Sequence, residues 1–463
     1  MKALFQNLPA DTGAAFVVIQ HLDPKHESLT AEILTRFTSM PTAQVTAGML
    51  VEPNHVYVIP PNAYLTLNRH TLELGKPVLR HGLRMPIDTF LSSLAEQHQE
   101  RAVAIIVSGT GSDGTLGLRA IKDGGGLVLA QSPDTAQYDG MPRSAIATGL
   151  VDIVCPVEEM HKHIIGYLRH AYVIEHASSI DSTPVPAADA RCLSQILAVL
   201  ETRIGHDFRV YKQGTLGRRI ARRMGLNHID TLADYLIFLR AHDDEARKLF
   251  KDLLISVTSF FRDSEAFDVL DQKVIAPLVA RKQADEHIRV WVPGCATGEE
   301  AYSIAMLLLE HLDNAPKHCP IQVFASDIDE SALSVARTGL YPENVAANLS
   351  PERLQRFFTK EDHSYRVNKL LRDTVTFAAQ NVISDPPFSK IDLICCRNLL
   401  IYLNADVQRK VLGLFHFALR DDGHLFLGHS EAVNQEGLFE PLSKKWRIYR
   451  RTGAARPQAV DIP

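Results

Sequence analysis

The chain has 463 residues, of which 46% are hydrophobic and 22% are charged, a balance that is ordinary for globular proteins and argues against bulk disorder. At about 150 residues per domain this length predicts about three domains, and the net charge of −5 gives no reason to expect nucleic acid or an anionic membrane as a partner. No apolar run approaches the roughly 18 residues of a membrane span, and the six cysteines form no C-x-x-C pair, so we expect a cytoplasmic protein with reduced thiols, no membrane insertion and no metal site.

Residues 1–170 have the pattern of an α/β domain. Short β-branched runs alternate there with helical stretches such as Ile87 to His98 and Thr115 to Lys122. The runs are FVVIQ (16–20), VYVIP (56–60), VAIIVS (103–108) and GLVLA (126–130). Strands that alternate with helices predict a parallel sheet covered on both faces.

Two polar residues follow predicted strands of this domain. His21 ends the run VVIQH, and Asp113 lies in the Gly-rich loop SGTGSDG after VAIIVS. Because α/β sheets carry their functional groups at the carboxyl ends of parallel strands, these residues supply two members of a Ser-His-Asp triad. The alternatives are a structural histidine and an aspartate that caps the helix predicted from Thr115.

The rest of the chain divides at a linker. The stretch ASSIDSTPVPAADA, from Ala177 to Ala190, is small, polar and Pro-containing, and we place the linker at residues 171–190. Residues 191–255 have helical periodicity, and strands alternate with helices again within 256–452. The predicted fold is therefore α/β, with two doubly wound sheet domains separated by the linker and a small all-helical domain.

An arginine-rich helix is the main feature of the helical domain. In GRRIARRM (217–224) the spacing i, i+4 pairs Arg218 with Arg222 and Arg219 with Arg223, opposite an apolar stripe of leucine, isoleucine and methionine. One interpretation is a solvated helix face. The other is a docking face for an acidic helical substrate.

The second α/β domain contains a turn suited to a nucleotide-like ligand. The strand IRVWVP (288–293) runs into GCATGEE and a helix, and the next strand ends at Asp327. A glycine turn with a carboxylate at the tip of the second strand, without G-x-G-x-x-G or a Walker lysine, suits adenosine without a polyphosphate, and S-adenosylmethionine fits that description. The alternative is that Gly294 and Gly298 only shape the turn and Asp327 only caps a helix.

From Cys192 to Arg451 the chain resembles the chemotaxis receptor glutamate methyltransferases, the CheR family. The motifs that carry the resemblance are SVTSFFRD (256–263), GCATGEEAYSIAM (294–306), FASDID (324–329), CRNLLIYL (396–403) and LFLGHSE (425–431). The resemblance implies a helical domain at 191–255 and a Rossmann-like methyltransferase domain at 256–452 with a small β-subdomain near 354–371. It also implies that the helical domain docks the receptor, with Arg218, Arg219, Arg222 and Arg223 as the docking residues.

The CheR resemblance further implies a set of site residues. Glu300 corresponds to the acidic residue near the methionine ammonium, Asp327 to the ribose carboxylate and Tyr402 to the tyrosine beside the transferred methyl. The cofactor-binding set is Ser256, Thr258, Arg262, Glu300, Asp327, Asn381, Val382, Arg397 and Asn398. Because the glutamate nucleophile is already an anion, the displacement needs orientation rather than a base, and we expect Arg262 and Tyr402 to provide it.

Residues 1 to about 165 resemble the catalytic domain of the chemotaxis receptor methylesterases, the CheB family. The matching segments are VVIQHLDP (17–24), SGTGSDGTLGLRAI (108–121) and AQSPDTAQYDGMPRSAI (130–146). The resemblance assigns the triad histidine to His21 and the triad aspartate to Asp113. The serine of the family, in a Ser-x-Gly-Gly turn after an initial strand, has no counterpart after Met1, so we expect this domain to lack esterase activity and to be poorly stable alone.

The sequence thus predicts S-adenosylmethionine-dependent O-methylation of glutamate side chains on a chemotaxis-type receptor, which is the expected partner. One alternative is a bifunctional methylase and demethylase, should Met1 be an internal methionine of a longer reading frame. The others are a non-catalytic signalling scaffold and a small-molecule methyltransferase.

Overall fold

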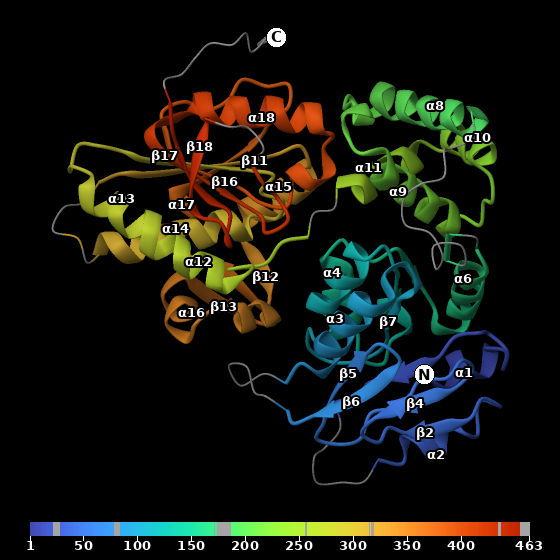
Figure 1. Ribbon diagram of the computed structural model, residues 1–463. Coiled ribbons are helices and arrows are strands. Elements are labelled where there is room, and N and C mark those ends of the chain that lie inside the picture. Colours follow the sequence, from blue (N-terminus) through green and yellow to red (C-terminus); the bar gives the residue numbers. More distant parts are fainter. Residues whose placement is uncertain are drawn as a thin grey trace. The chain divides into compact units, whose positions relative to one another are not determined.

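Two compact units make up the chain (Figure 1). The first contains residues 1–207, 216–255 and 342–347, and the second contains 208–215, 256–341 and 348–463. The computed structural model describes residues 1–21, 28–77, 84–170, 172–173, 187–254, 257–313, 315, 319–433 and 437–453.

The described strands of the first unit form three sheets of three strands each. Two sheets are parallel, with orders β1-β4-β2 and β7-β8-β9, and the third is antiparallel, with order β3-β6-β5. The bounds are β1 (Phe16–Val18), β2 (Thr42–Gln44), β3 (Met49–Leu50), β4 (Val56–Val58), β5 (Tyr64–Asn68), β6 (Thr71–Gly75), β7 (Val103–Ile106), β8 (Leu127–Gln131) and β9 (Ile153–Cys155). The four β-branched runs are therefore strands, but they belong to two parallel sheets.

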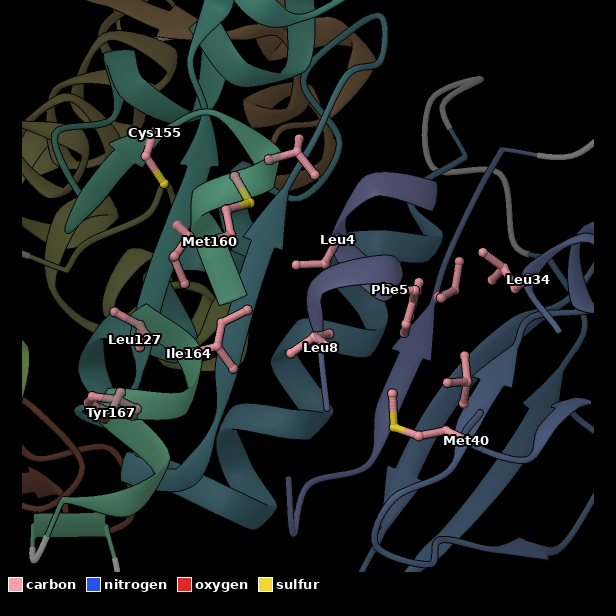
Figure 2. Close-up of a cluster of buried hydrophobic side chains, with 14 of the residues drawn as sticks. Leu4, Phe5, Leu8, Leu34, Met40, Leu127, Cys155, Met160, Ile164 and Tyr167 are labelled. Carbon is pink, nitrogen blue, oxygen red and sulfur yellow. The ribbon is translucent and has the colours of Figure 1, made fainter. Parts of the chain in front are cut away.

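Helix α1 packs its apolar side chains between two parts of one core. It spans Lys2–Asn7, and the other helices of the α/β part are α2 (Thr30–Leu34), α3 (Pro86–His98), α4 (Thr115–Asp123), α5 (Gly140–Ala147) and α6 (Val157–Arg169). Figure 2 shows Leu4 pointing toward α6, whereas Phe5 points the other way, toward Leu34 and Met40. The core thus includes side chains from both parallel sheets, among them Val58 of β4 and Leu127 of β8.

Helices α3 and α4 pack closely enough to fix the loop before α4. Leu118 and Ile121 of α4 are fully buried in a second core with Leu91 of α3. A Cβ atom added at Gly117 would lie 2.5 Å from the Cβ atom of Leu91, so a side chain there would force the helices apart. This packing places Asp113, two residues before α4, against the beginning of α3.

The helical segment of the chain contains α8 (Ala187–Ile204), α9 (Gln213–Leu226), α10 (Leu232–Ala241) and α11 (Asp243–Leu254). The predicted apolar stripe of α9 is buried, with exposed fractions of 1% for Leu216, 0% for Ile220 and 6% for Met224. Thr231 begins α10 as its N-cap, and its hydroxyl accepts a hydrogen bond from the backbone N–H of Asp234. Local periodicity and capping explain these helices.

A seven-stranded sheet with order β15-β11-β10-β16-β17-β19-β18 forms the second unit. The bounds are β10 (Ile288–Pro293), β11 (Ile321–Asp327), β15 (Val375–Ala379), β16 (Ile391–Cys396), β17 (Leu419–Leu427), β18 (Phe439–Ser443) and β19 (Ile448–Arg451). The first five strands in the sheet order are parallel, and β19 pairs antiparallel with both of its neighbours, β17 and β18. Since β11 and β16 flank β10 on opposite sides, the chain changes direction across the sheet at β10, the position where open α/β sheets bind ligands.

Helices cover both faces of this sheet (Figure 1). Trp291 of β10 packs edge-on against Phe415 of α18, with ring centroids 5.5 Å apart. The helices are α12 (Ser264–Leu270), α13 (Ala276–Arg281), α14 (Glu299–Asp313), α15 (Glu330–Thr338), α16 (Pro351–Phe357), α17 (Lys369–Thr374) and α18 (Ala405–Ala418). The α/β fold predicted from the sequence is confirmed, and no described helix is long and apolar enough to cross a membrane.

A small sheet lies in the insert after α15. It has order β12-β14-β13, with β12 at Leu340–Pro342, β13 at Phe358–Glu361 and β14 at Ser364–Val367. Strands β13 and β14 form an antiparallel hairpin whose two-residue turn contains Asp362 in a left-handed conformation, with φ of 44°. This hairpin lies within the segment where the sequence predicts a β-subdomain.

Candidate functional site

The glycine loop of the second unit joins β10 to α14. Gly294 and Gly298 have φ angles of 69° and 92°, which side-chain-bearing residues rarely adopt. A Cβ atom added at Gly298 would lie 2.8 Å from the Cβ atom of Ala336. The loop is also tied to the neighbouring strand, because the backbone N–H of Gly294 donates to the carbonyl of Ser326 at 2.7 Å.

Asp327, at the end of β11, holds this loop with its carboxylate. Oδ2 accepts a hydrogen bond from the backbone N–H of Ala296 at 2.8 Å, and Oδ1 accepts one from the N–H of Asp329 at 2.9 Å. Burial raises the pKa of Asp327 above its ordinary value. The helix-capping alternative for Asp327 is wrong, because Asp329 is the N-cap of α15 and accepts hydrogen bonds from Ser331 and Ala332.

Glu300 takes part in a charge cluster at the carboxyl edge of the sheet. Arg397 Nη1 donates to Glu300 Oε2 at 3.1 Å, and Arg397 Nη2 donates to Asp263 Oδ2 at 2.5 Å. The guanidinium lies over the rings of Phe267 and Phe426, 5.3 and 4.8 Å from their centroids, and its side chain is 1% exposed. Arg397 is therefore a fixed cation that orients two carboxylates.

Cys395 is a contact that sequence reasoning missed. Its thiol donates to Glu300 Oε1 at 3.0 Å. Burial and the Glu300 carboxylate raise the pKa of Cys395, so the thiol keeps its proton. The sequence predicted only a reduced thiol here, and the signal that could have indicated more was the position of Cys395 immediately before the CRNLLIYL motif, on the strand beside β10.

Glu431 is a second residue that sequence reasoning did not assign. It is 4% exposed and lies at the end of the LFLGHSE motif. Its carboxylate accepts four backbone hydrogen bonds, from Gly428, Asn398, Leu400 and Ile401. These bonds hold the loop that carries Asn398, with φ of 59°, and continues into Tyr402.

The structure gathers several predicted residues at one edge of the sheet. Glu300 follows β10, Asp327 ends β11, Asn381 and Val382 follow β15, and Arg397 and Asn398 follow β16, and these four strands are consecutive in the sheet. Asn381 is held by its own turn, because its backbone N–H donates to Asp385 Oδ2 at 2.8 Å and its Oδ1 accepts from Ile383 at 3.0 Å.

Four more residues were predicted for the methyltransferase site: Ser256, Thr258, Arg262 and Tyr402. Thr258 and Tyr402 are half-buried, and Ser256 lies outside the described residues. Arg262 is half-buried, and its Nη1 donates to the carbonyl of Val257 at 2.9 Å.

In the first unit, His21 and Asp113 form a pair. His21 Nε2 lies 2.9 Å from Asp113 Oδ2, with the His21 side chain 44% exposed and the Asp113 side chain 7% exposed. Asp113 also accepts backbone hydrogen bonds from Ile87 and Asp88, both at 3.0 Å, in the first turn of α3. These two bonds from the first turn of α3 fix the orientation of the Asp113 carboxyl group toward His21. Asp113 does not cap α4, whose N-cap is Gly114 and has no side-chain cap.

Asp88 lies behind this pair and was also missed. It is 5% exposed, and its Oδ1 accepts a hydrogen bond from the backbone N–H of Gly117 at 2.7 Å. Burial and the neighbouring Asp113 carboxylate raise the pKa of Asp88 to about 8. Asp88 therefore carries its proton near neutral pH.

The side-chain exposure of the arginines on α9 differs from what the predicted docking role requires. Only Arg218 is exposed, whereas Arg219, Arg222 and Arg223 have exposed fractions of 9%, 0% and 7%. The expectation of an exposed face with four arginines is wrong for these three, because carboxylates and carbonyls of the same unit cover them. Among the residues that the structure describes there is no cluster of three potential metal ligands.

Comparison with known proteins agrees with these observations. Residues 1–164 match the CheB methylesterase family, residues 193–254 the all-alpha domain of CheR methyltransferases, and residues 256–448 the SAM binding domain of CheR methyltransferases. The catalytic domain of Thermotoga maritima CheB methylesterase is similar at 29% identity and a TM-score of 0.34, over 35% of this chain and 89% of that chain.

Several relatives have similar sequences. An uncharacterized 104.1 kDa protein from the hypE 3' region of Rhodobacter capsulatus is 40% identical over 450 residues, 93% of this chain and 47% of that protein, so the chain spans about half its length. The chemotaxis protein methyltransferase of Escherichia coli K12 is 34% identical over 248 residues, 51% of this chain and 82% of that protein. Chemotaxis protein methyltransferase 1 of Pseudomonas aeruginosa is 33% identical over 48% of this chain and 83% of that protein. The chain belongs to the CheR methyltransferase family, and it joins a CheB methylesterase domain to CheR all-alpha and SAM-binding domains.

Proposed function

We propose that the second unit binds S-adenosylmethionine at the carboxyl edge of β15, β11, β10 and β16 and transfers its methyl group to glutamate side chains of a chemotaxis-type receptor. The observation that carries the proposal is the convergence of Glu300, Asp327 and Asn381 on one edge, around a glycine loop. Each oxygen of a carboxylate has two lone pairs and can accept more than one hydrogen bond. Asp327 can therefore accept from a ribose diol in addition to its bonds from Ala296 and Asp329.

The same chemistry favours Glu300 as the partner of an ammonium group. Its side chain is 12% exposed, and its carboxylate is held by hydrogen bonds from Arg397 and Cys395. A carboxylate held in this way is oriented before a ligand arrives, which lowers the entropic cost of binding. Arg397 and Asn398 belong to the same edge and complete the adenosine side of the proposed site.

When bound, the cofactor supplies an electrophilic methyl group on a sulfonium. The protein must then bring a substrate carboxylate into line with that group, and the reaction forms an O–CH₃ bond, breaks an S–CH₃ bond and needs no proton transfer. Arg262 holds the incoming carboxylate by charge-assisted hydrogen bonds, and Tyr402 orients it as a hydrogen-bond donor. The loop bound by Glu431 keeps Tyr402 in position. The proposed receptor substrate and a cytoplasmic location follow from this role.

The first unit also contains a histidine–aspartate pair, His21 and Asp113. In Ser-His-Asp hydrolases the histidine activates a serine hydroxyl, and among the described residues no hydroxyl or thiol side chain is hydrogen-bonded to His21. We infer that hydrolysis of a methyl ester by this pair would require a nucleophile hydrogen-bonded to His21.

Calorimetric titration of the full chain with S-adenosylhomocysteine tests the cofactor site. Saturable binding with one site per chain is expected, and Gln322→Ala, an exposed substitution on β11, serves as the control that should bind equally. Absence of binding by the folded chain would contradict the cofactor site and favour a non-catalytic scaffold.

A further inference from the structure

A buried charge network surrounds Arg222 of α9. Its Nε donates to the carbonyl of Gly125 at 3.0 Å, and its Nη2 donates to the carbonyl of Gly126 at 2.7 Å. Two carboxylates also bind it, Asp152 at Nη2 and Asp252 at Nη1, both at 2.6 Å. Asp252 belongs to α11 of the helical segment, whereas Asp152 and the two glycines belong to the α/β part of the same unit. Arg222 is 0% exposed and therefore connects the two parts from the inside.

Lys122 makes this network electrically neutral. Its Nζ lies 2.5 Å from Asp152 Oδ1 and 2.9 Å from Asp252 Oδ1. Arg223, which pairs with Glu245, lies 3.8 Å from Asp252 Oδ2, so three cations face three anions. Burial alone would raise the pKa of Asp252, but Lys122 and Arg222 hold it well below its ordinary value. Buried charges are tolerated only when all of them are paired, and removal of one partner is strongly destabilising. Such a network suits a permanent contact.

Arg219 adds hydrogen bonds to the end of α4. Its Nη1 donates to the carbonyl of Lys122 at 3.1 Å, and its Nη2 donates to the carbonyl of Asp123 at 3.0 Å. The last carbonyls of a helix have no partner within the helix and carry partial negative charge, so they favour cations. Arg219 and Arg222 together satisfy the carbonyls of residues 122, 123, 125 and 126, at and just beyond the C-terminus of α4.

Arg218 and Arg223 do not share this role. Arg218 is exposed, and Arg223 forms a bidentate pair with Glu245 of α11, at 2.8 and 2.6 Å, inside the helical segment. The four arginines thus have three different environments. Only Arg219 and Arg222 donate hydrogen bonds to the α/β part.

We propose that α9 is the internal interface that fastens the helical segment to the α/β part of the first unit, with Arg219 and Arg222 committed to the end of α4 and to Asp152. The partner of this arginine face is the chain's own CheB-type domain. A substrate would have to use other surfaces of the helical segment. This inference is independent of the methyl-transfer proposal, because it concerns contacts within the first unit only.

Hydrogen exchange of the full chain, followed by mass spectrometry, tests the interface. Arg219→Met removes two hydrogen bonds across it and leaves the ion pairs of Arg222 intact. We expect exchange to rise about tenfold or more both in α9 and at the C-terminus of α4, because the two sides protect each other. Arg218→Met is the matched control and should leave both segments unchanged.

Two further variants keep the test decisive. Asp152→Asn removes the carboxylate on the α/β side and should increase exchange in α9, although residue 152 is not part of that helix. Arg223→Met should increase exchange in α9 and α11 but not at the end of α4. The proposal would be overturned if Arg219→Met behaved like Arg218→Met, or if its effect stopped at α9 as that of Arg223→Met is expected to do.

Discussion

Asp327 Oδ2 accepts the backbone N–H of Ala296 at 2.8 Å, so the residue at the tip of β11 fixes the glycine loop that follows β10. Asp327→Ala removes both this bond and the proposed ribose contact. A hydrogen bond to a charged acceptor contributes about 1.5–3 kcal/mol, so affinity for S-adenosylmethionine should fall about 10- to 150-fold. Calorimetry on the variant measures this loss of affinity. Normal binding by Asp327→Ala would show that Asp327 does not contribute to the cofactor site.

Arg262 is expected to act on the incoming carboxylate rather than on the cofactor. Arg262→Ala should therefore lower kcat at saturating cofactor by about 10- to 100-fold, which corresponds to about 1.4–2.7 kcal/mol of transition-state stabilisation. The dissociation constant for S-adenosylhomocysteine should change by less than about threefold. A loss of cofactor affinity as large as the loss of turnover would assign Arg262 to cofactor binding instead.

The protonated state of Asp88 gives a pH-dependent prediction. Burial and Asp113 raise the pKa of Asp88 to about 8 in the folded protein, against about 3.9 in an unfolded chain. The folded state then binds one more proton than the unfolded state between about pH 4 and pH 8, so the contribution of Asp88 is complete below about pH 4 and is lost as the pH rises toward 8.

Asp88→Asn separates this effect from packing. The amide keeps the shape of a protonated carboxyl group and its ability to donate a hydrogen bond to Asp113, but it does not titrate. Chemical denaturation at pH 5, 6.5 and 8 should show the variant gaining stability relative to the parent chain as the pH rises. A constant difference across this range would mean that Asp88 is ionised throughout.

If the buried arginines of α9 are structural, their replacement should lower the stability of the fold, whereas replacement of a docking face should raise the KM for receptor. Charge reversal of Arg222 leaves Lys122 as the cation shared by Asp152 and Asp252 and adds a third carboxylate beside them in the interior. Breaking a buried pair costs about 3–5 kcal/mol. Arg222→Glu should therefore lower the midpoint of urea unfolding sharply, whereas Arg218→Glu should change it little. If both variants unfolded like the parent chain and only the KM for receptor rose, the docking interpretation would be restored.

These arginines also show where sequence reasoning reached its limit. The spacing i, i+4 identified which arginines share a face of α9 and which apolar residues oppose them, and both follow from helix geometry alone. The covering residue Asp152 is 70 positions from Arg222, so no local pattern indicates it. Strands such as β10 and β11 were predictable because their buried β-branched runs are local.

The same distinction between local patterns and tertiary contacts applies to the candidate site. Asp327 and Glu300 were predictable because they stand at strand and helix ends within motifs. The roles of Cys395, Glu431 and Asp88 depend on tertiary contacts with residues 95, 33 and 25 positions away, to Glu300, Asn398 and Asp113. Glu431 belongs to the LFLGHSE motif and Cys395 immediately precedes the CRNLLIYL motif, but neither motif indicates what these side chains bind.

The most direct test of the central claim is transfer of a radiolabelled methyl group from S-adenosylmethionine to receptor-enriched membranes by the full chain. Methyl esters are hydrolysed by mild base, so label on the receptor should be released as volatile methanol after base treatment. Asp327→Ala and Arg262→Ala should both reduce the incorporation, and the Gln322→Ala control should not. Label that is stable to base, or no label from a chain that binds S-adenosylhomocysteine normally, would contradict the assignment as a receptor glutamate methyltransferase.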